Sequence, residues 1–162
     1  MSAQAQPFRN GAGPLARPLA VRAIVAGIIG GIIVDLFLIV TRMAPFPGIY
    51  QFIASTLVGE IAFTSPSYIW LGVAMHFVIS IVWALIYAYV ANAAHALQKW
   101  LLGGLVFGVV VMIVMQIIQV VMGIAQPVSV GGIVVNLISH VVFFGLPIAW
   151  YLSLPYRRAH AV

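Results

Sequence analysis

The stretch AMHFVISIVWALIYAYV, residues 74–90, decides the fold class. It belongs to an apolar run over about residues 67–92, and the ionisable His76 interrupts side chains that are otherwise suited to lipid. A helix of about 20 residues crosses the ~30 Å hydrocarbon core of a bilayer. Three further runs have this length and character, at about residues 20–42, 101–123 and 131–154. The pattern predicts four transmembrane segments.

These segments are predicted to be helices, because barrel strands alternate polar and apolar residues over about ten positions and these runs are continuously apolar. Composition agrees with a membrane protein, since 64% of the 162 residues are hydrophobic and 6% are charged. Asp35 and Glu60 are the only acidic residues of the chain. The sequence therefore predicts an all-α integral membrane protein, a four-transmembrane-helix bundle.

The chain has no cysteine, which excludes disulfides, thiolate metal sites and cysteine nucleophiles. No nucleophile–base constellation, phosphate-binding glycine loop or HExxH spacing occurs, so an enzyme is not expected. The net charge of +5 comes from basic residues that flank the apolar runs. It reflects membrane topology, and no nucleic-acid partner is expected. The expected partners are the lipid bilayer and either further copies of the chain or a larger membrane complex.

The basic residues also predict the orientation. Of the seven Lys and Arg residues, Arg42 alone lies on one side of the predicted membrane. The other six basic residues lie on the opposite side: Arg9, Arg17, Arg22, Lys99, Arg157 and Arg158. Basic residues favour the cytoplasmic side. We expect a multi-pass protein of the bacterial inner (cytoplasmic) membrane with both termini in the cytoplasm.

The segments outside the spans have distinct characters. Residues 1–18 are rich in Gly, Pro, Ala and Gln and are expected to be a mobile N-terminal tail, and residues 155–162 form a basic C-terminal tail. Residues 19–154 are then the transmembrane domain, with a retained first span rather than a cleaved signal. Residues 48–61 place apolar side chains at helical spacing, with Gln51 and Glu60 between them. This pattern predicts a short amphipathic helix at the outer interface.

Polar side chains within the spans gather at one depth. Counting 1.5 Å per residue from the outer end of each helix places six of them roughly 6–14 Å below the outer surface. They are Asp35, His76, Gln116, Gln119, Asn136 and His140. Polar groups in a span are expensive to bury, face the bundle interior and are candidates for function. We predict that they form one ligand or proton site, with Arg42 and Glu60 at its rim.

Three functions fit this layer. The first is binding or sensing of a proton or small cation by His76, His140 and Asp35. A soft-metal variant adds Met75 and Met115 and would favour Cu(I). The second is haem b, with His76 and His140 as axial ligands from diagonal helices. The third is a structural or accessory subunit whose polar groups only hydrogen-bond between helices, at about 1 kcal/mol per bond.

Four motifs resemble the YagU-like family of small bacterial inner-membrane proteins. They are GIIGGIIVDLF at 27–37, HFVISIVWALIYAYV at 76–90, KWLLGGLVFG at 99–108 and ISHVVFFGLPIAW at 138–150. The resemblance implies the inner membrane, the four-span fold and a role in acid tolerance. This chain departs from the family in a shorter first outer loop and in Asn136, where the likeness suggests an acidic residue.

Overall fold

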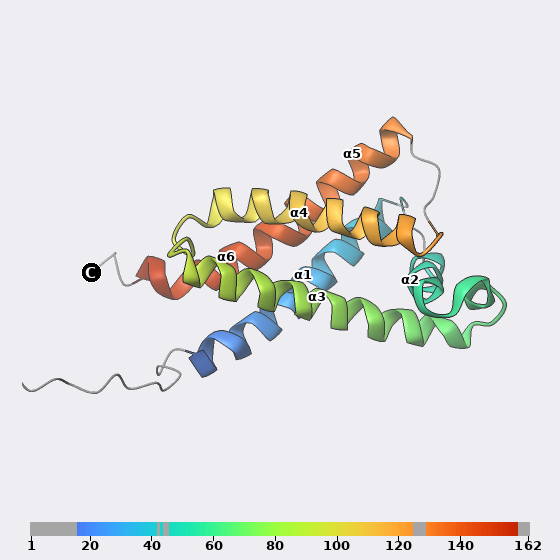
Figure 1. The fold of residues 1–162 in the computed structure, drawn as a ribbon, viewed down its shortest axis with the longest axis horizontal. Helices are drawn as coiled ribbons and strands as arrows, with labels where there is room; N and C mark the ends of the chain where they lie inside the picture. The colour runs from blue at the N-terminus through green and yellow to red at the C-terminus, as the bar shows by residue number, and fades with distance from the viewer. Residues whose placement is uncertain (1–15, 42, 44–45, 125–128, 159–162) are drawn as a thin grey trace, which may run out of the picture.

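The computed structural model describes residues 16–158 apart from residues 42, 44–45 and 125–128 (Figure 1). These described residues are almost entirely helical and contain no strand. The helices are α1 (Ala16–Val40), α2 (Gly48–Val58), the 3-10 helix η1 (Gly59–Phe63), α3 (Ser67–Ala93), α4 (Trp100–Val121), α5 (Val130–Ile138), the π-helical segment η2 (Ser139–Gly145) and α6 (Leu146–Arg158).

Four stretches of helix are long and apolar enough to cross a membrane, namely Leu19–Val40, Ser67–Ala93, Trp100–Val121 and Val130–Tyr156. The last of these consists of α5, η2 and α6, which follow one another without a break. The predicted fold class, an all-α four-helix bundle with a short helix in the first loop, is confirmed. The division into two tails and a transmembrane domain stays a prediction, because residues 1–15 and 159–162 lie outside the described residues.

The four spans pack in the order α3, α1, fourth span, α4. Helix α1 contacts α3 on one side and η2 with α6 on the other, and α4 packs against η2 and α6. The backbones of helices α3 and α4 make few close contacts. Near the end where residues 94–99 connect them, the Phe107 ring of α4 packs against Tyr87 and Trp83 of α3, with ring centroids 4.8 and 6.2 Å apart. Figure 1 shows the two helices diverging from that end.

Glycines allow the close helix contacts in this bundle. A Cβ atom at Gly27 of α1 would lie 2.6 Å from the Cα atom of Ile81 in α3. At Gly108 of α4 a Cβ atom would lie 2.5 Å from the carbonyl oxygen of His140. Both neighbours are backbone atoms, so the two helix pairs meet backbone to backbone at these points. Small residues at helix interfaces permit such approach in membranes.

Arg22 compensates for a proline in the fourth span. In an α-helix the N–H of residue 155 would bond to the carbonyl of residue 151, but Pro155 has no N–H. The guanidinium Nη2 atom of Arg22 donates to the Tyr151 carbonyl at 3.2 Å and to the Leu152 carbonyl at 2.6 Å. Arg22, expected from sequence only to set topology, thus also joins α1 to α6.

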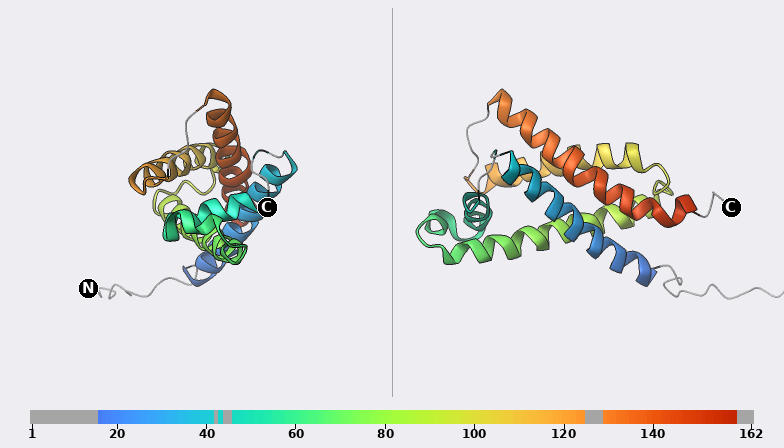
Figure 2. Two further views of the ribbon diagram at one scale, coloured as in Figure 1. Left: turned by 90° about the vertical axis from the view of Figure 1, so that its right-hand side faces the viewer. Right: turned by 180° about the vertical axis from the view of Figure 1, so that it is seen from behind.

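The first loop folds as α2 and η1 across one end of the bundle, at the end opposite to the start of α1 and the end of α6 (Figures 1 and 2). Helix α2 buries Tyr50, Ala54 and Ser55 and exposes Leu57. Its backbone lies directly on α3, because a Cβ atom at Gly72 would overlap the carbonyl group of Tyr50. The short helix therefore covers one end of the space between α1, α3 and α4.

Candidate functional site

A carboxylate and an imidazole meet between α1 and α3. Asp35 is buried in α1, and its Oδ1 atom lies 3.2 Å from Nε2 of His76 in α3. The imidazole can come this close because Gly31 lies one helical turn before Asp35, and a Cβ atom at Gly31 would be 3.3 Å from His76 Nε2. The structure thus brings together two of the residues predicted from depth.

The hydrogen bond of His76 is made to the backbone. Its Nε2 atom lies 3.3 Å from the Gly31 carbonyl oxygen with hydrogen-bond geometry. Because a carbonyl oxygen only accepts, Nε2 carries a proton in this arrangement, and in a neutral ring Nδ1 keeps a lone pair. Asp35 Oδ1 is within ion-pair distance of Nε2 but is a buried oxygen without a hydrogen bond in the described part of the chain.

Tyr50 completes the cluster from α2. Its hydroxyl donates to Asp35 Oδ2 at 2.7 Å, and its ring meets the His76 ring edge-on with centroids 6.2 Å apart. Tyr50 is not among the site residues predicted from the sequence. Tyr50 belongs to a loop helix whose path could not be predicted, and the only sequence feature pointing to it is one tyrosine within an otherwise apolar and weakly polar helix.

The environment of Tyr50 raises the pKa of its phenol. Burial is the main cause, followed by the hydrogen bond to Asp35 and the negative charge of that carboxylate. A raised pKa means that the phenol contributes stability below its ordinary pKa of about 10, and that this stability is lost as pH rises through the raised value. Tyr50 is therefore a hydrogen-bond donor throughout the physiological range.

We expect Asp35→Asn to lower the pKa of Tyr50 while leaving it above the ordinary tyrosine value. The substitution removes the carboxylate charge, but burial persists. Ultraviolet pH titration of the purified protein in detergent measures this, with Tyr50→Phe subtracted in each background to isolate one phenol. An unchanged or higher pKa in Asp35→Asn would show that the carboxylate does not act on Tyr50.

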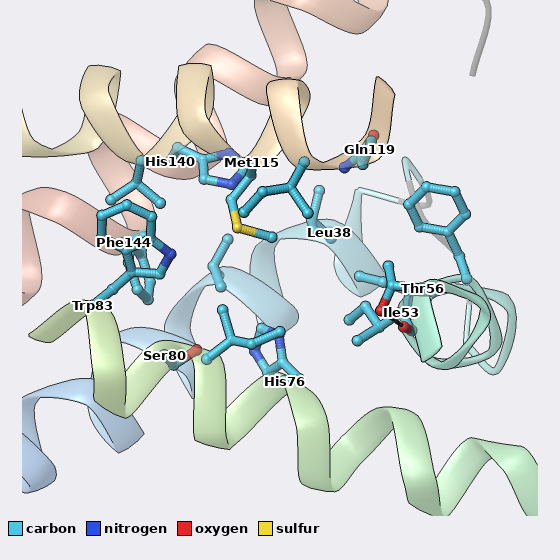
Figure 3. A pocket seen from close by; sticks show the side chains of 16 residues that line it. Leu38, Ile53, Thr56, His76, Ser80, Trp83, Met115, Gln119, His140 and Phe144 are labelled. Carbon is cyan, nitrogen blue, oxygen red and sulfur yellow. Dashed lines mark hydrogen bonds between the residues drawn. The ribbon is translucent and has the colours of Figure 1, made fainter. Parts of the chain in front are cut away.

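A cavity of about 180 Å³ lies beside this cluster (Figure 3). Side chains from α1, α2, α3, α4 and η2 line it, and most of them are apolar. His76 lies on one side, His140 lies on the other, and the side chain of Met115 reaches into the space between them (Figure 3). Gln119 and Thr56 line the end near α2.

His140 occupies the π-helical segment of the fourth span. Its Nδ1 atom lies 2.9 Å from the Asn136 carbonyl oxygen and 3.3 Å from Ser139 Oγ. The carbonyl accepts, so Nδ1 carries a proton and Nε2 keeps a lone pair when the ring is neutral. Sequence periodicity predicted a regular α-helix here and gave no sign of the π-helical turn. Such turns occur frequently at functional sites.

The remaining predicted site residues are placed differently. Gln119 lines the cavity, whereas Gln116 and Asn136 do not, and Asn136 contributes its backbone carbonyl to His140. Glu60 is exposed on η1. Arg42 lies outside the described residues.

Metal ligation has little basis among the described residues. No group of three or more His, Cys, Asp or Glu side chains in that part of the chain is arranged to hold a metal ion. Of the two methionines considered as soft ligands, Met115 lines the cavity and Met75 does not. The cluster is better described as a carboxylate that accepts a hydrogen bond from Tyr50 and lies within ion-pair distance of His76, beside an apolar cavity.

Comparison of the chain with models of protein families, with curated proteins and with solved structures finds no match. The class of protein therefore follows from the fold and the site alone. It is a membrane-spanning helical protein with a buried Asp35–His76 pair.

Proposed function

We propose that this protein binds a proton at the Asp35–His76 pair and senses pH through this binding. The observation that carries the proposal is Asp35 Oδ1, a buried carboxylate oxygen that lies 3.2 Å from an imidazole nitrogen and has no hydrogen bond from any residue that the structure describes. A buried ionised carboxylate is unfavourable unless it is neutralised or fully hydrogen-bonded. Gaining one proton on the pair relieves this penalty.

The surrounding groups make the pair responsive to a single proton. With His76 neutral and Asp35 ionised, the cluster carries one negative charge, and one added proton brings it to zero. The other titratable groups that face it are Tyr50 from α2 and His140 from η2, while α4 contributes the neutral Gln119. Net charge inside a membrane is costly, so the two proton states differ strongly in their electrostatic energy.

The structural alternative explains less of the geometry. Interhelical polar contacts that only stabilise a bundle are expected to satisfy each buried donor and acceptor. Here one carboxylate oxygen accepts no hydrogen bond within the described part of the chain, and a cavity lies beside the imidazole. An accessory or structural subunit is therefore the second candidate, and it predicts no proton exchange at the pair.

Haem b receives less support than a proton. Pockets for drug-sized ligands measure about 300–1,000 Å³, and a haem needs a pocket of this size class. The cavity beside the pair measures about 180 Å³. The soft-metal variant also receives less support, because His76, His140 and Asp35 do not form a metal-holding group. No catalytic activity is included in the proposal.

The proposed setting is the bacterial inner membrane, with both chain termini in the cytoplasm and α2 on the outer side. The distribution of basic residues supports this orientation. In that orientation the cluster lies nearer the outer surface and responds to external acid, as the resemblance to the YagU-like family implies. Association with further copies or with a larger membrane complex stays part of the proposal.

The test is proton uptake by the purified protein in lipid. Infrared difference spectra of wild type and of Asp35→Asn, each recorded between about pH 5 and pH 8, should differ by the uptake of about one proton per chain, because the other histidines are common to both. Asp35→Asn and His76→Gln should each remove the associated carboxyl or imidazole bands. Glu60→Gln is the matched control, because Glu60 is the other acidic residue and is exposed. Identical spectra in wild type and Asp35→Asn would favour the structural alternative.

A further inference from the structure

The cavity beside the pair has the chemistry of a site for an organic cation. Its lining is mainly apolar and includes the aromatic rings of Trp83, Phe52 and Phe144. Few oxygen atoms reach it, from Thr56, Ser80 and Gln119, whereas hard metal ions such as Na⁺ or Ca²⁺ need several oxygen ligands. The lining therefore favours a ligand with an apolar body over a small hydrated ion.

The charges around the cavity favour a positive ligand. No Lys or Arg side chain lines it within the residues that the structure describes. The carboxylate of Asp35 lies directly behind His76, one of the lining residues. A negative charge one imidazole away, with no Lys or Arg side chain among the described residues of the lining, attracts a cation and repels an anion.

The two histidines add hydrogen-bond acceptors. The N–H group of His76 at Nε2 is used by Gly31, and that of His140 at Nδ1 is used by Asn136. In their neutral forms the rings have only lone pairs left to offer, at His76 Nδ1 and His140 Nε2. A ligand in the cavity beside either ring is therefore best accommodated as a hydrogen-bond donor.

We propose that this cavity binds a small organic ammonium ion with one apolar ring, in competition with the proton. An apolar protein cavity of about 150 Å³ accepts benzene, so a volume of about 180 Å³ accommodates one ring with an aminomethyl group. The ammonium N–H groups donate to the imidazoles, and Trp83 supplies a cation–π surface. The inference rests on the proposed function in that the same Asp35–His76 pair provides the negative charge.

The ammonium ion and the proton then oppose each other. Protonation of the pair removes its net negative charge and, on an imidazole, also removes a lone pair that the ligand uses. By linkage, an ion that binds the deprotonated state more tightly must lower the proton affinity of the pair by the same factor. The groups that take part are Asp35, Tyr50, His76 and His140, from α1, α2, α3 and η2.

Three probes of one shape and different charge test the proposal: benzylammonium, benzyl alcohol and benzoate. Binding to the purified wild-type protein is measured by equilibrium dialysis and by Trp83 fluorescence, with empty detergent micelles and Trp83→Phe as backgrounds. Benzylammonium should bind about tenfold or more tightly than benzyl alcohol, and benzoate more weakly than both. The affinity of the protein for benzylammonium should fall as pH is lowered from about 8 to 5, while the affinity for benzyl alcohol changes less.

Asp35→Asn should lower the affinity for benzylammonium about tenfold and leave the affinity for benzyl alcohol within about twofold of the wild-type value. Equal affinity of wild type for benzylammonium and benzyl alcohol, or no binding of either, would overturn the inference even if Asp35→Asn failed to fold. Proton uptake without this charge selectivity would contradict the inference alone. Charge-selective binding without proton uptake at the pair would instead contradict the proposed function.

Discussion

Gly27→Ala is expected to lower the stability of the protein by about 1–3 kcal/mol, the usual range for overpacking a tight contact. A Cβ atom at this position would lie 2.6 Å from Ile81 Cα and 2.8 Å from the Ser80 carbonyl oxygen. Backbone atoms cannot rotate away, so α1 and α3 must separate. Thermal unfolding in detergent should show a decrease of several degrees, since 1 kcal/mol corresponds to about 2–4 °C for a chain of this size.

Gly131→Ala is the matched control for this experiment. Gly131 also lies in a helix, α5, and a Cβ atom there would meet nothing within 4 Å. Alanine is a better helix former than glycine by roughly 0.5–1 kcal/mol, so the control should be neutral or slightly stabilising. A comparable loss of stability in both variants would show that the α1–α3 contact is not the cause.

Tyr50→Phe is expected to destabilise the protein by about 1.5–3 kcal/mol, as for other hydrogen bonds to charged groups. The Tyr50 hydroxyl donates to Asp35 Oδ2, and Asp35 Oδ1 is already without a hydrogen bond among the described residues. Removal of the Tyr50 hydroxyl leaves the buried Asp35 carboxyl group with no hydrogen-bond donor among the described residues. The same substitution in an Asp35→Asn background should have a smaller effect, because the acceptor no longer carries charge.

Tyr156→Phe provides the comparison for Tyr50→Phe. The Tyr156 hydroxyl also donates to a side-chain oxygen, Asn92 Oδ1, but at 3.3 Å and in an exposed position. Exposed hydrogen bonds contribute little because water replaces them. Equal melting temperatures for the two variants would indicate that Tyr50 is not important for holding the carboxylate.

Helix depth was the part of the site that could be predicted from sequence. A membrane helix advances by a constant rise, so counting from the span ends placed Asp35, His76 and His140 in one layer. The structure pairs the first two directly and places the third across a shared cavity. Gly27 and Gly31 in α1, and Gly104 and Gly108 in α4, have the four-residue spacing that favours close helix contacts, and Gly27 and Gly108 lie where two helices meet.

Tertiary approach could not be predicted in the same way. Tyr50 reaches Asp35 because α2 folds back across the bundle, and this path depends on Gly72 admitting the Tyr50 backbone. No periodicity within α2 encodes a contact with α1. Gln116 shares the predicted depth but does not line the cavity, because depth along the membrane normal does not determine which face of a helix a side chain occupies.

The π-helical segment Ser139–Gly145 lets the fourth span lose one residue without changing the faces of the helices on either side. A π-turn holds about one residue more than an α-turn, and this extra residue is accommodated within the segment. Deleting one residue there would rewind the segment to α-helix and keep the faces of α5 and α6. The same deletion within α3 or α4 would rotate everything beyond it by about 100°. A one-residue deletion at η2 can therefore reposition His140 while the packing at both ends of the span is retained.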